Sequence, residues 1–323
     1  MSEKEARRRL QVGGQAVIEG VMMRSPVCIA TAVRTPGGEI VVEKEPFTSL
    51  TRRFRILNIP IIRGAIAFVE TFVIAIRALS FSADKATAPA ESTGGAAGAG
   101  TGETEAVSTA DSRTKKKGGA GISSFHIAIT IIAAFALGFG LFFYLPLLIT
   151  EATGLSQGVL FNLVDGLIRL VFLILYIVLI TRWKEMRRIF EYHGAEHKTI
   201  AAFEEEGTAT PENVRAYSTL HARCSTSFLL LVVVVSIIVF MILGRPHGIE
   251  GKLIRFAFIP VIGGVSYELL KLSADPRIRP FMAFLVVPGL FLQKLTTKEP
   301  SLDQLEVAIA ALNACIADKT VES

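Results

Sequence analysis

Cysteine is scarce in this sequence. Only three cysteines occur among 323 residues, and no two of them form a C-x-x-C pair. This scarcity excludes a disulfide framework and fits a reducing compartment. The first nine residues are mostly charged and lack the apolar core of a signal peptide.

A phosphate-binding loop is also missing. The stretch Val12–Arg24 is rich in glycine, but the Lys-Ser/Thr that such a loop requires is absent, so we interpret its glycines as permitting tight turns. Two strands are predicted after it, at Val27–Thr35 and Glu39–Glu45, with a turn at Pro36-Gly37-Gly38 between them. Residues 1–55 are therefore expected to form a small cytoplasmic β-rich unit.

Apolar residues are abundant instead. They make up 51% of the chain, and the mean hydropathy is positive, which is unusual for a soluble protein of this length. The net charge of +5 is modest and requires no direct nucleic-acid binding. Lys and Arg beside apolar runs indicate a membrane surface. The predicted fold is a mainly α-helical, polytopic protein of the lipid bilayer.

About four transmembrane helices are predicted within residues 122–295. They are Phe125–Thr150, Val159–Ile180, Phe228–Leu243 and Leu253–Leu272. Asp165 and Arg169 lie four residues apart inside the second and are expected to pair. Basic residues precede the first span and follow the second and fourth, whereas the loop between the first and second has none. The positive-inside rule then places both termini and the loop 182–225 in the cytoplasm.

The remaining segments have weaker signatures. Residues 56–82 are apolar but carry Arg63, Glu70 and Arg77 at seven-residue spacing, which predicts an interfacial or re-entrant helix that does not cross. We interpret these charges as an internal salt-bridge stripe, or alternatively as a group that holds a polar substrate head. The other segments are a flexible linker at 83–121, an interfacial or re-entrant piece at 280–294 and a cytoplasmic amphipathic helix within 296–323.

The most informative motif is His193-Gly194-Ala195-Glu196-His197. On a helix the two histidines lie on one face, which is the geometry of a two-histidine metal chelate. The order H-x-x-E-H is the inverted zinc-protease signature. Apolar residues at three- and four-residue steps predict a helix over 182–206 with both histidines directed inward. The alternative is a pair of core histidines that hydrogen-bond to the backbone.

Two other stretches, one with His221 and Cys224 and one with Glu268, reach the same predicted side of the membrane and supply further ligands. A catalytic zinc usually has three protein ligands and one open position. For the third ligand we rank Glu268 first, because a carboxylate inside a membrane needs a partner, then His221, and then Cys224. If both histidines, His221 and Cys224 all bind, the site closes and becomes structural.

Glu196 is the expected catalytic residue. It would act as the general base that activates metal-bound water, whose pKa the metal lowers toward neutrality. The alternative is a solvated helix glutamate. Glu19 and Arg24 are expected either to cover the site from the cytosol or to belong to a surface β segment.

Four stretches together resemble one family. They are Gly13–Arg24, the Pro60-x-x-Arg63-Gly64 step, Tyr192–Lys198 and His221-x-Arg223-Cys224-x-Thr226-Ser227-Phe228. The family is the YqhQ-like family of uncharacterised bacterial membrane proteins, described as predicted metal-dependent enzymes. The resemblance implies a bacterial cytoplasmic membrane protein. It also implies a link to protein synthesis or insertion, through the ribosome or translocon, because family genes often lie beside translation genes.

Three function hypotheses follow. The first is a zinc-type membrane hydrolase that acts on a peptide or lipid substrate. The second is a non-catalytic membrane factor in protein biogenesis, with a structural metal or none. The third is a transporter in which the same residues bind a passing cation.

Overall fold

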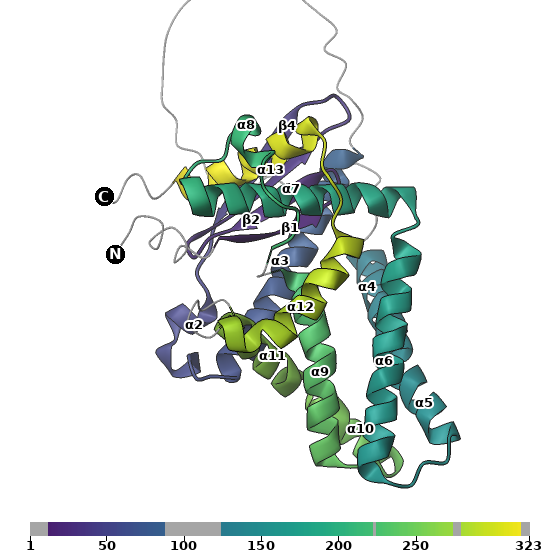
Figure 1. Cartoon of the computed structure of the whole chain (residues 1–323). Coiled ribbons are helices and arrows are strands. Elements are labelled where there is room, and N and C mark those ends of the chain that lie inside the picture. Colours follow the sequence, from purple (N-terminus) through teal and green to yellow (C-terminus); the bar gives the residue numbers. More distant parts are fainter. Residues whose placement is uncertain (1–11, 88–123, 222–223, 274–278, 318–323) are drawn as a thin grey trace, which may run out of the picture.

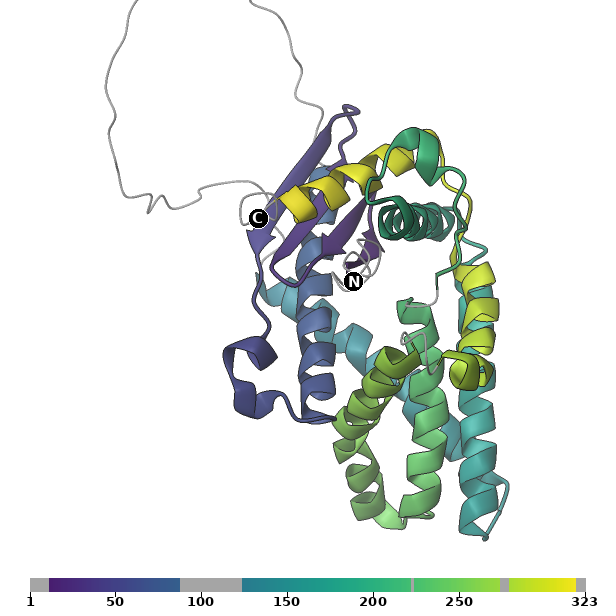
Figure 2. The same cartoon turned by 60° about the vertical axis from the view of Figure 1, so that its left-hand side comes forward.

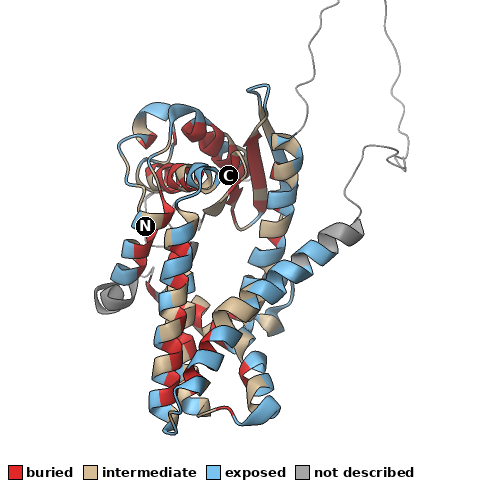
Figure 3. Cartoon of the chain, turned by 90° about the vertical axis from the view of Figure 1, so that its right-hand side faces the viewer, coloured by how far each residue is buried: buried red, intermediate tan, exposed pale blue. Residues whose placement is uncertain are grey.

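Two layers are stacked along the long axis of the molecule (Figure 1). The computed structural model describes residues 12–87, 124–221, 224–273 and 279–317. One layer, called here the sheet unit, contains the strands and the helices that cover them; the other, the helical unit, contains long apolar helices. Buried residues fill the sheet unit, whereas exposed residues line the outer faces of the long helices (Figure 3).

The sheet is an antiparallel meander in the order β1-β2-β3-β4. Its strands are β1 (Gly13–Val17), β2 (Gly20–Arg24), β3 (Cys28–Arg34) and β4 (Ile40–Pro46). Gly38 has φ 90° in the turn between β3 and β4, a conformation that glycine adopts without steric cost. The small N-terminal sheet is therefore present, and the glycine-rich stretch contributes two strands to it.

Helices pack on both faces of this sheet (Figure 2). They are α3 (Ile62–Ala86), α7 (Lys184–Glu206) and α13 (Leu302–Ile316), and the short α8 (Pro211–Val214) packs on α7 and α13. Successive strand residues face opposite sides. Val21 and Met23 therefore join the core with α7 and α13, whereas Met22 packs with Ile74 and Ala78 of α3. The predicted helices around the paired histidines and at the C-terminal end are both present, and the sheet unit is built around them.

The helical unit is more apolar. It comprises α2 (Leu50–Arg53), η1 (Arg55–Leu57), α4 (Ser124–Phe139), η2 (Gly140–Tyr144), α5 (Leu145–Ala152), α6 (Gly158–Ile180), α9 (Ser225–Leu243), α10 (Gly248–Ala257), α11 (Ile259–Ser273) and α12 (Arg279–Thr296). Among the described residues, five stretches are long and apolar enough to cross a membrane: Ile62–Ala86, Ile132–Ala152, Gly158–Ile180, Thr226–Leu243 and Gly248–Ser273. This is one more than predicted, because α3 also meets the criterion of length and composition.

Helix α3 connects the two layers. Its N-terminal half packs on α11 so closely that a Cβ on Gly64 would lie 2.5 Å from the carbonyl oxygen of Gly264. The predicted internal salt-bridge stripe is wrong. Arg63 pairs with Glu268 of α11 (Nε to Oε1, 2.7 Å), and Glu70 pairs with Arg24 of β2 (3.4 Å). Charges seven residues apart are separated by about 10 Å along a helix, so they contact other elements rather than each other.

A second polar cluster lies inside the helical unit. The predicted pair between Asp165 and Arg169 on α6 is confirmed, with an oxygen–nitrogen distance of 2.8 Å. Arg255 of α10 approaches the same carboxylate at 3.4 Å, and it also donates to Asn162. The guanidinium groups of both arginines lie within 5 Å of the Phe240 ring centre. Buried charge in this layer is therefore compensated by a partner carboxylate and an aromatic ring.

Candidate metal centre

Helix α7 places the two predicted imidazole ligands side by side on one face. The ring centres of His193 and His197 are 4.4 Å apart. Gly194 lies between them, and a Cβ at this position would be 2.0 Å from the carbonyl oxygen of Lys298. Only glycine therefore lets the segment after α12 cross α7 here. The amide of Lys298 donates to the carbonyl of Phe190 (2.9 Å), which fixes the crossing.

Both imidazole rings are oriented by backbone carbonyl groups. Nδ1 of His193 lies 2.8 Å from the carbonyl oxygen of Thr296, and Nδ1 of His197 lies 2.6 Å from that of Thr219. A carbonyl only accepts hydrogen bonds, so each Nδ1 carries the proton. When such a ring is neutral, its lone pair is on Nε2. This arrangement of a metal-binding histidine against a carbonyl is common in metal sites.

Cys224 provides a third donor. Its Sγ lies 3.2 Å from Nε2 of His193, and one ligand atom from each of His193, His197 and Cys224 lies within 4.8 Å of the others. Cys224 is the N-cap residue of α9, and its sulfur accepts a hydrogen bond from the amide of Thr226 (3.3 Å). Burial raises the pKa of this thiol to about 11, so it is protonated unless a cation lies beside it.

Glu196 lies next to these donors and is buried, with 5% of its surface exposed. Burial raises the pKa of its carboxyl group to about 7, although the electrostatic effect of the neighbouring His193 and a backbone hydrogen bond from Gly14 act in the opposite direction. Gly14 of β1 is close, because a Cβ there would lie 3.0 Å from Cγ of Glu196. The carboxyl group can therefore exchange a proton near neutral pH. The alternative, a solvated helix glutamate, is wrong, because β1 covers this side chain.

The charge state of His197 also fits cation binding. Burial lowers the pKa of His197 well below its usual value, with a smaller contribution from His193 in the same direction. His197 is therefore neutral, as a metal ligand must be. Two imidazole nitrogens and one sulfur form a donor set of the kind that zinc binds, and three protein donors leave a fourth position.

Comparisons with known proteins address the family. A family model described as "Protein of unknown function (DUF1385)" matches residues 59–318. The chain is also 33% identical over 306 residues to an "Uncharacterized protein YqhQ" of Bacillus subtilis (strain 168), across 93% of this chain and 91% of the relative. The chain belongs to the DUF1385 family. No solved structure matches it.

This DUF1385 chain does not use Glu268 as predicted. Both carboxylate oxygens of Glu268 accept hydrogen bonds from Arg63, at 2.7 and 2.5 Å. The expectation that this carboxylate needs a cationic partner was sound, but the cation is a guanidinium from α3. Cys224, ranked last of the three candidates, lies beside the histidines instead.

His221 lies near the centre without joining the three clustered donors. Its ring centre is 5.8 Å from that of His197, and its Nε2 is 3.7 Å from a carboxylate oxygen of Glu204. The backbone of His221 is held on both sides by Gln293 of α12, at 3.0 and 2.9 Å. This clamp fixes the chain three residues before Cys224.

The two predicted covering residues differ in position. Glu19, in the β1–β2 turn with φ 52°, pairs with Arg188 of α7 and so braces the helix upstream of the histidines. Arg24 points to the opposite face of the sheet, toward Glu70 and the ring of Phe47. Of these two residues, only Glu19 therefore contacts α7, the helix that carries the candidate metal centre.

Sequence reasoning missed the groups that orient the donors. Thr219 and Thr296 act through backbone carbonyls, which every residue type has, so no side-chain pattern signals them. Gln293 offers a weak signal, since it is an uncharged polar residue in an apolar helix, and it is fully buried.

Proposed function

We propose that this chain is a metal-dependent membrane hydrolase that binds zinc through His193, His197 and Cys224. One observation carries the proposal. Nδ1 of each imidazole is bonded to a backbone carbonyl, Nε2 of His193 lies 3.2 Å from the Cys224 sulfur, and one ligand atom from each of His193, His197 and Cys224 lies within 4.8 Å of the others. Without a cation, the protonated thiol of Cys224 can donate to Nε2 of His193, and a bound cation would replace this proton.

Each protein group has a distinct role in this proposal. Zinc, when bound, would supply Lewis-acid chemistry and lower the pKa of a water molecule to about 7. Glu196 would act as the proton acceptor for such a water, because its own pKa of about 7 allows it to take and release a proton at neutral pH. The carbonyls of Thr219 and Thr296 hold the imidazoles in position. The substrate class that suits a site between a sheet and apolar helices is a peptide or a lipid.

The proposal also includes the side of the membrane on which the candidate metal centre lies. Basic residues flank the apolar helices on the side of the sheet unit, at Arg182 and Arg187 after α6 and at Lys271 near the end of α11. The positive-inside rule then places the sheet unit, the centre and both termini in the bacterial cytoplasm, with the helical unit in the cytoplasmic membrane.

A Glu196→Gln variant tests the catalytic part. It keeps the size of the side chain and removes the proton acceptor. We expect it to retain zinc, measured by elemental analysis of the purified protein, and to lose hydrolysis of a lipid or peptide library by at least about 100-fold. Glu185→Gln, on the exposed surface of the same helix, is the matched control and should keep both properties.

One observation favours a non-catalytic function as the second candidate. His197 and Cys224 are 2% and 4% exposed, and such burial is typical of structural metal sites. In that case the chain would be a membrane factor in protein biogenesis. Full complementation of a gene deletion by Glu196→Gln, together with loss of complementation in His193→Ala, would favour this function over the hydrolase.

A further inference from the structure

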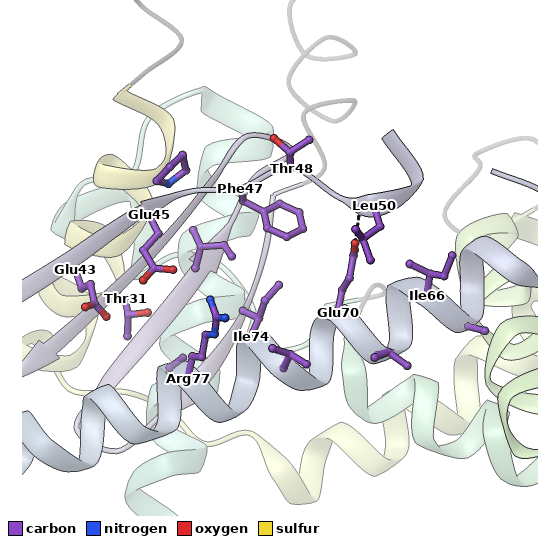
Figure 4. Close-up of a pocket in the computed structure, with 16 residues that line it drawn as sticks. Thr31, Glu43, Glu45, Phe47, Thr48, Leu50, Ile66, Glu70, Ile74 and Arg77 are labelled. Carbon is purple, nitrogen blue, oxygen red and sulfur yellow. Dashed lines mark hydrogen bonds between the residues drawn. The ribbon is translucent and has the colours of Figure 1, made fainter. Parts of the chain in front are cut away.

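A groove lies on the face of the sheet opposite to α7. It has a volume of about 550 Å³ and runs between α3 on one side and β3, β4 and the segment after β4 on the other (Figure 4). Its volume is in the range of ligand-binding pockets, about 300–1,000 Å³. None of its lining residues belongs to the candidate metal centre.

One end of the groove is apolar. Ile66, Val69 and Val73 of α3 form its floor, and Phe47 and Leu50 form part of the opposite wall. Val69 and Val73 are also among the exposed apolar residues of α3, and this helix is apolar enough to cross a membrane. The groove is therefore continuous with a surface that contacts lipid chains when α3 lies in a membrane.

The other end of the groove is charged. Arg77 of α3 extends toward the sheet at the same end as Glu43 and Glu45 of β4, whereas Ile66 and Leu50 lie at the opposite end (Figure 4). All three charged side chains are exposed. Glu70, between the two ends, pairs with Arg24 (3.4 Å) and accepts hydrogen bonds from Ser49 and the amide of Leu50 (2.7 Å), so it does not add a free negative charge.

We propose that this groove binds a phospholipid with a zwitterionic, amine-bearing head, such as phosphatidylethanolamine. The guanidinium of Arg77 pairs with the phosphate, and Glu43 and Glu45 accept hydrogen bonds from the ammonium group. One acyl chain lies along Val73, Val69 and Ile66. Arg77 and Ile66 are eleven residues apart, which corresponds to about 16 Å along the helix and sets the direction of the chain.

The charge pattern selects this head over others. A lipid with a net negative head would meet one arginine but also two glutamates, which repel it. A choline head carries the same charges as ethanolamine but has no N–H to donate to the carboxylates. We therefore expect the groove to bind an ethanolamine head in preference to an anionic head and to a choline head.

Lipid retention in nanodiscs tests the proposal. The full-length protein is reconstituted in discs with equal parts of phosphatidylethanolamine, phosphatidylglycerol and phosphatidylcholine, and retained lipids are counted by native mass spectrometry. We expect phosphatidylethanolamine to be enriched about tenfold in the bound fraction, as one additional charge-assisted contact provides. Equal retention of the three lipids would overturn the proposal.

Two variants identify the groove as the site. Arg77→Gln, and separately Glu43→Gln with Glu45→Gln, should each reduce the enrichment by about tenfold. Arg55→Gln and Glu39→Gln, which change exposed charges outside the groove, are the matched controls and should leave it unchanged. All these residues are exposed, so the fold is preserved, and an unchanged Tm verifies it. Enrichment that survives in both groove variants, or a loss in Arg77→Gln alone, would contradict the zwitterionic site.

Discussion

Helices α6 and α7 are both 23 residues long and follow each other in the chain, yet they bury polar groups in different ways. In α6 the buried carboxylate of Asp165 binds two arginines directly. In α7 each imidazole uses Nδ1 on a backbone carbonyl, and Nε2 of His193 lies against the Cys224 sulfur. A buried polar residue therefore indicates a function only when the partners of all its hydrogen-bonding atoms have been identified.

Removing the buried carboxylate of α6 should have the largest effect on stability. Asp165→Asn leaves Arg169 and Arg255 buried with no charged partner between them, so we expect a loss of about 3–5 kcal/mol in the free energy of unfolding. Denaturant titration in detergent measures it. Adding Arg169→Met removes the excess charge and should recover part of the loss. A loss below about 1 kcal/mol in the single variant would show that the cluster is not tightly coupled.

The buried carboxyl group of α7 should make stability depend on pH. The pKa of Glu196 is raised from 4.5 to about 7, so the folded state of the metal-free protein binds more protons than the unfolded state between these values. Stability therefore falls as pH rises from 4.5 to 7, by about 3 kcal/mol in total. Glu196→Gln should remove this slope, measured by unfolding of chelator-treated protein at several pH values. A slope equal to that of wild type would contradict the assignment.

Disturbing the point where the segment after α12 crosses α7 should have a smaller effect on stability. Gly194→Ala places a methyl group 2.0 Å from the Lys298 carbonyl, and we expect a loss of about 1–3 kcal/mol together with weaker metal retention. Gly138→Ala in α4 is the control, because a Cβ there meets no atom within 4 Å. A neutral result at Gly194 would mean that the segment after α12 moves freely.

The smallest effect on stability is expected from breaking an ion pair in α7 whose residues have the same spacing as Asp165 and Arg169 in α6. Arg187 and Glu191 of α7 are also four residues apart, but Arg187 is 70% exposed, whereas Arg169 is 6% exposed. Arg187→Gln should cost no more than about 0.5 kcal/mol, since solvent screens the pair. A cost comparable to that of Asp165→Asn would contradict the view that burial, rather than spacing, decides the energy.

The sequence correctly predicted those features that depend on a single helix. The three- and four-residue apolar steps gave the helix that carries His193 and His197, because periodicity is a local property. The pair of Asp165 and Arg169 was predictable for the same reason. The amphipathic helix predicted within 296–323 is present as α13, and the amide of Ser301 donates to Oε1 of Gln304 (2.9 Å) at its start.

Sequence reasoning was less informative where distant segments compete for the same group. Glu268 needed a cation, but nothing in the pattern tells whether that cation is a metal or Arg63, 205 positions away in the sequence. Cys224 joins the histidines because α9 begins at that point and Gln293 holds the preceding backbone. These contacts depend on how α3, α9 and α12 pack, which the local pattern does not specify.

The central claim is that His193, His197 and Cys224 bind one cation together. Titrating the metal-free protein with Co²⁺ and recording the thiolate-to-cobalt charge-transfer absorption tests it most directly, because this absorption requires a sulfur ligand. The account predicts a band that saturates at one cobalt per chain, disappears in Cys224→Ser, weakens in His193→Ala and His197→Ala, and persists in His247→Ala, whose histidine is exposed and lies at the start of α10. Absence of the band in wild type, or its persistence in Cys224→Ser, would contradict the claim.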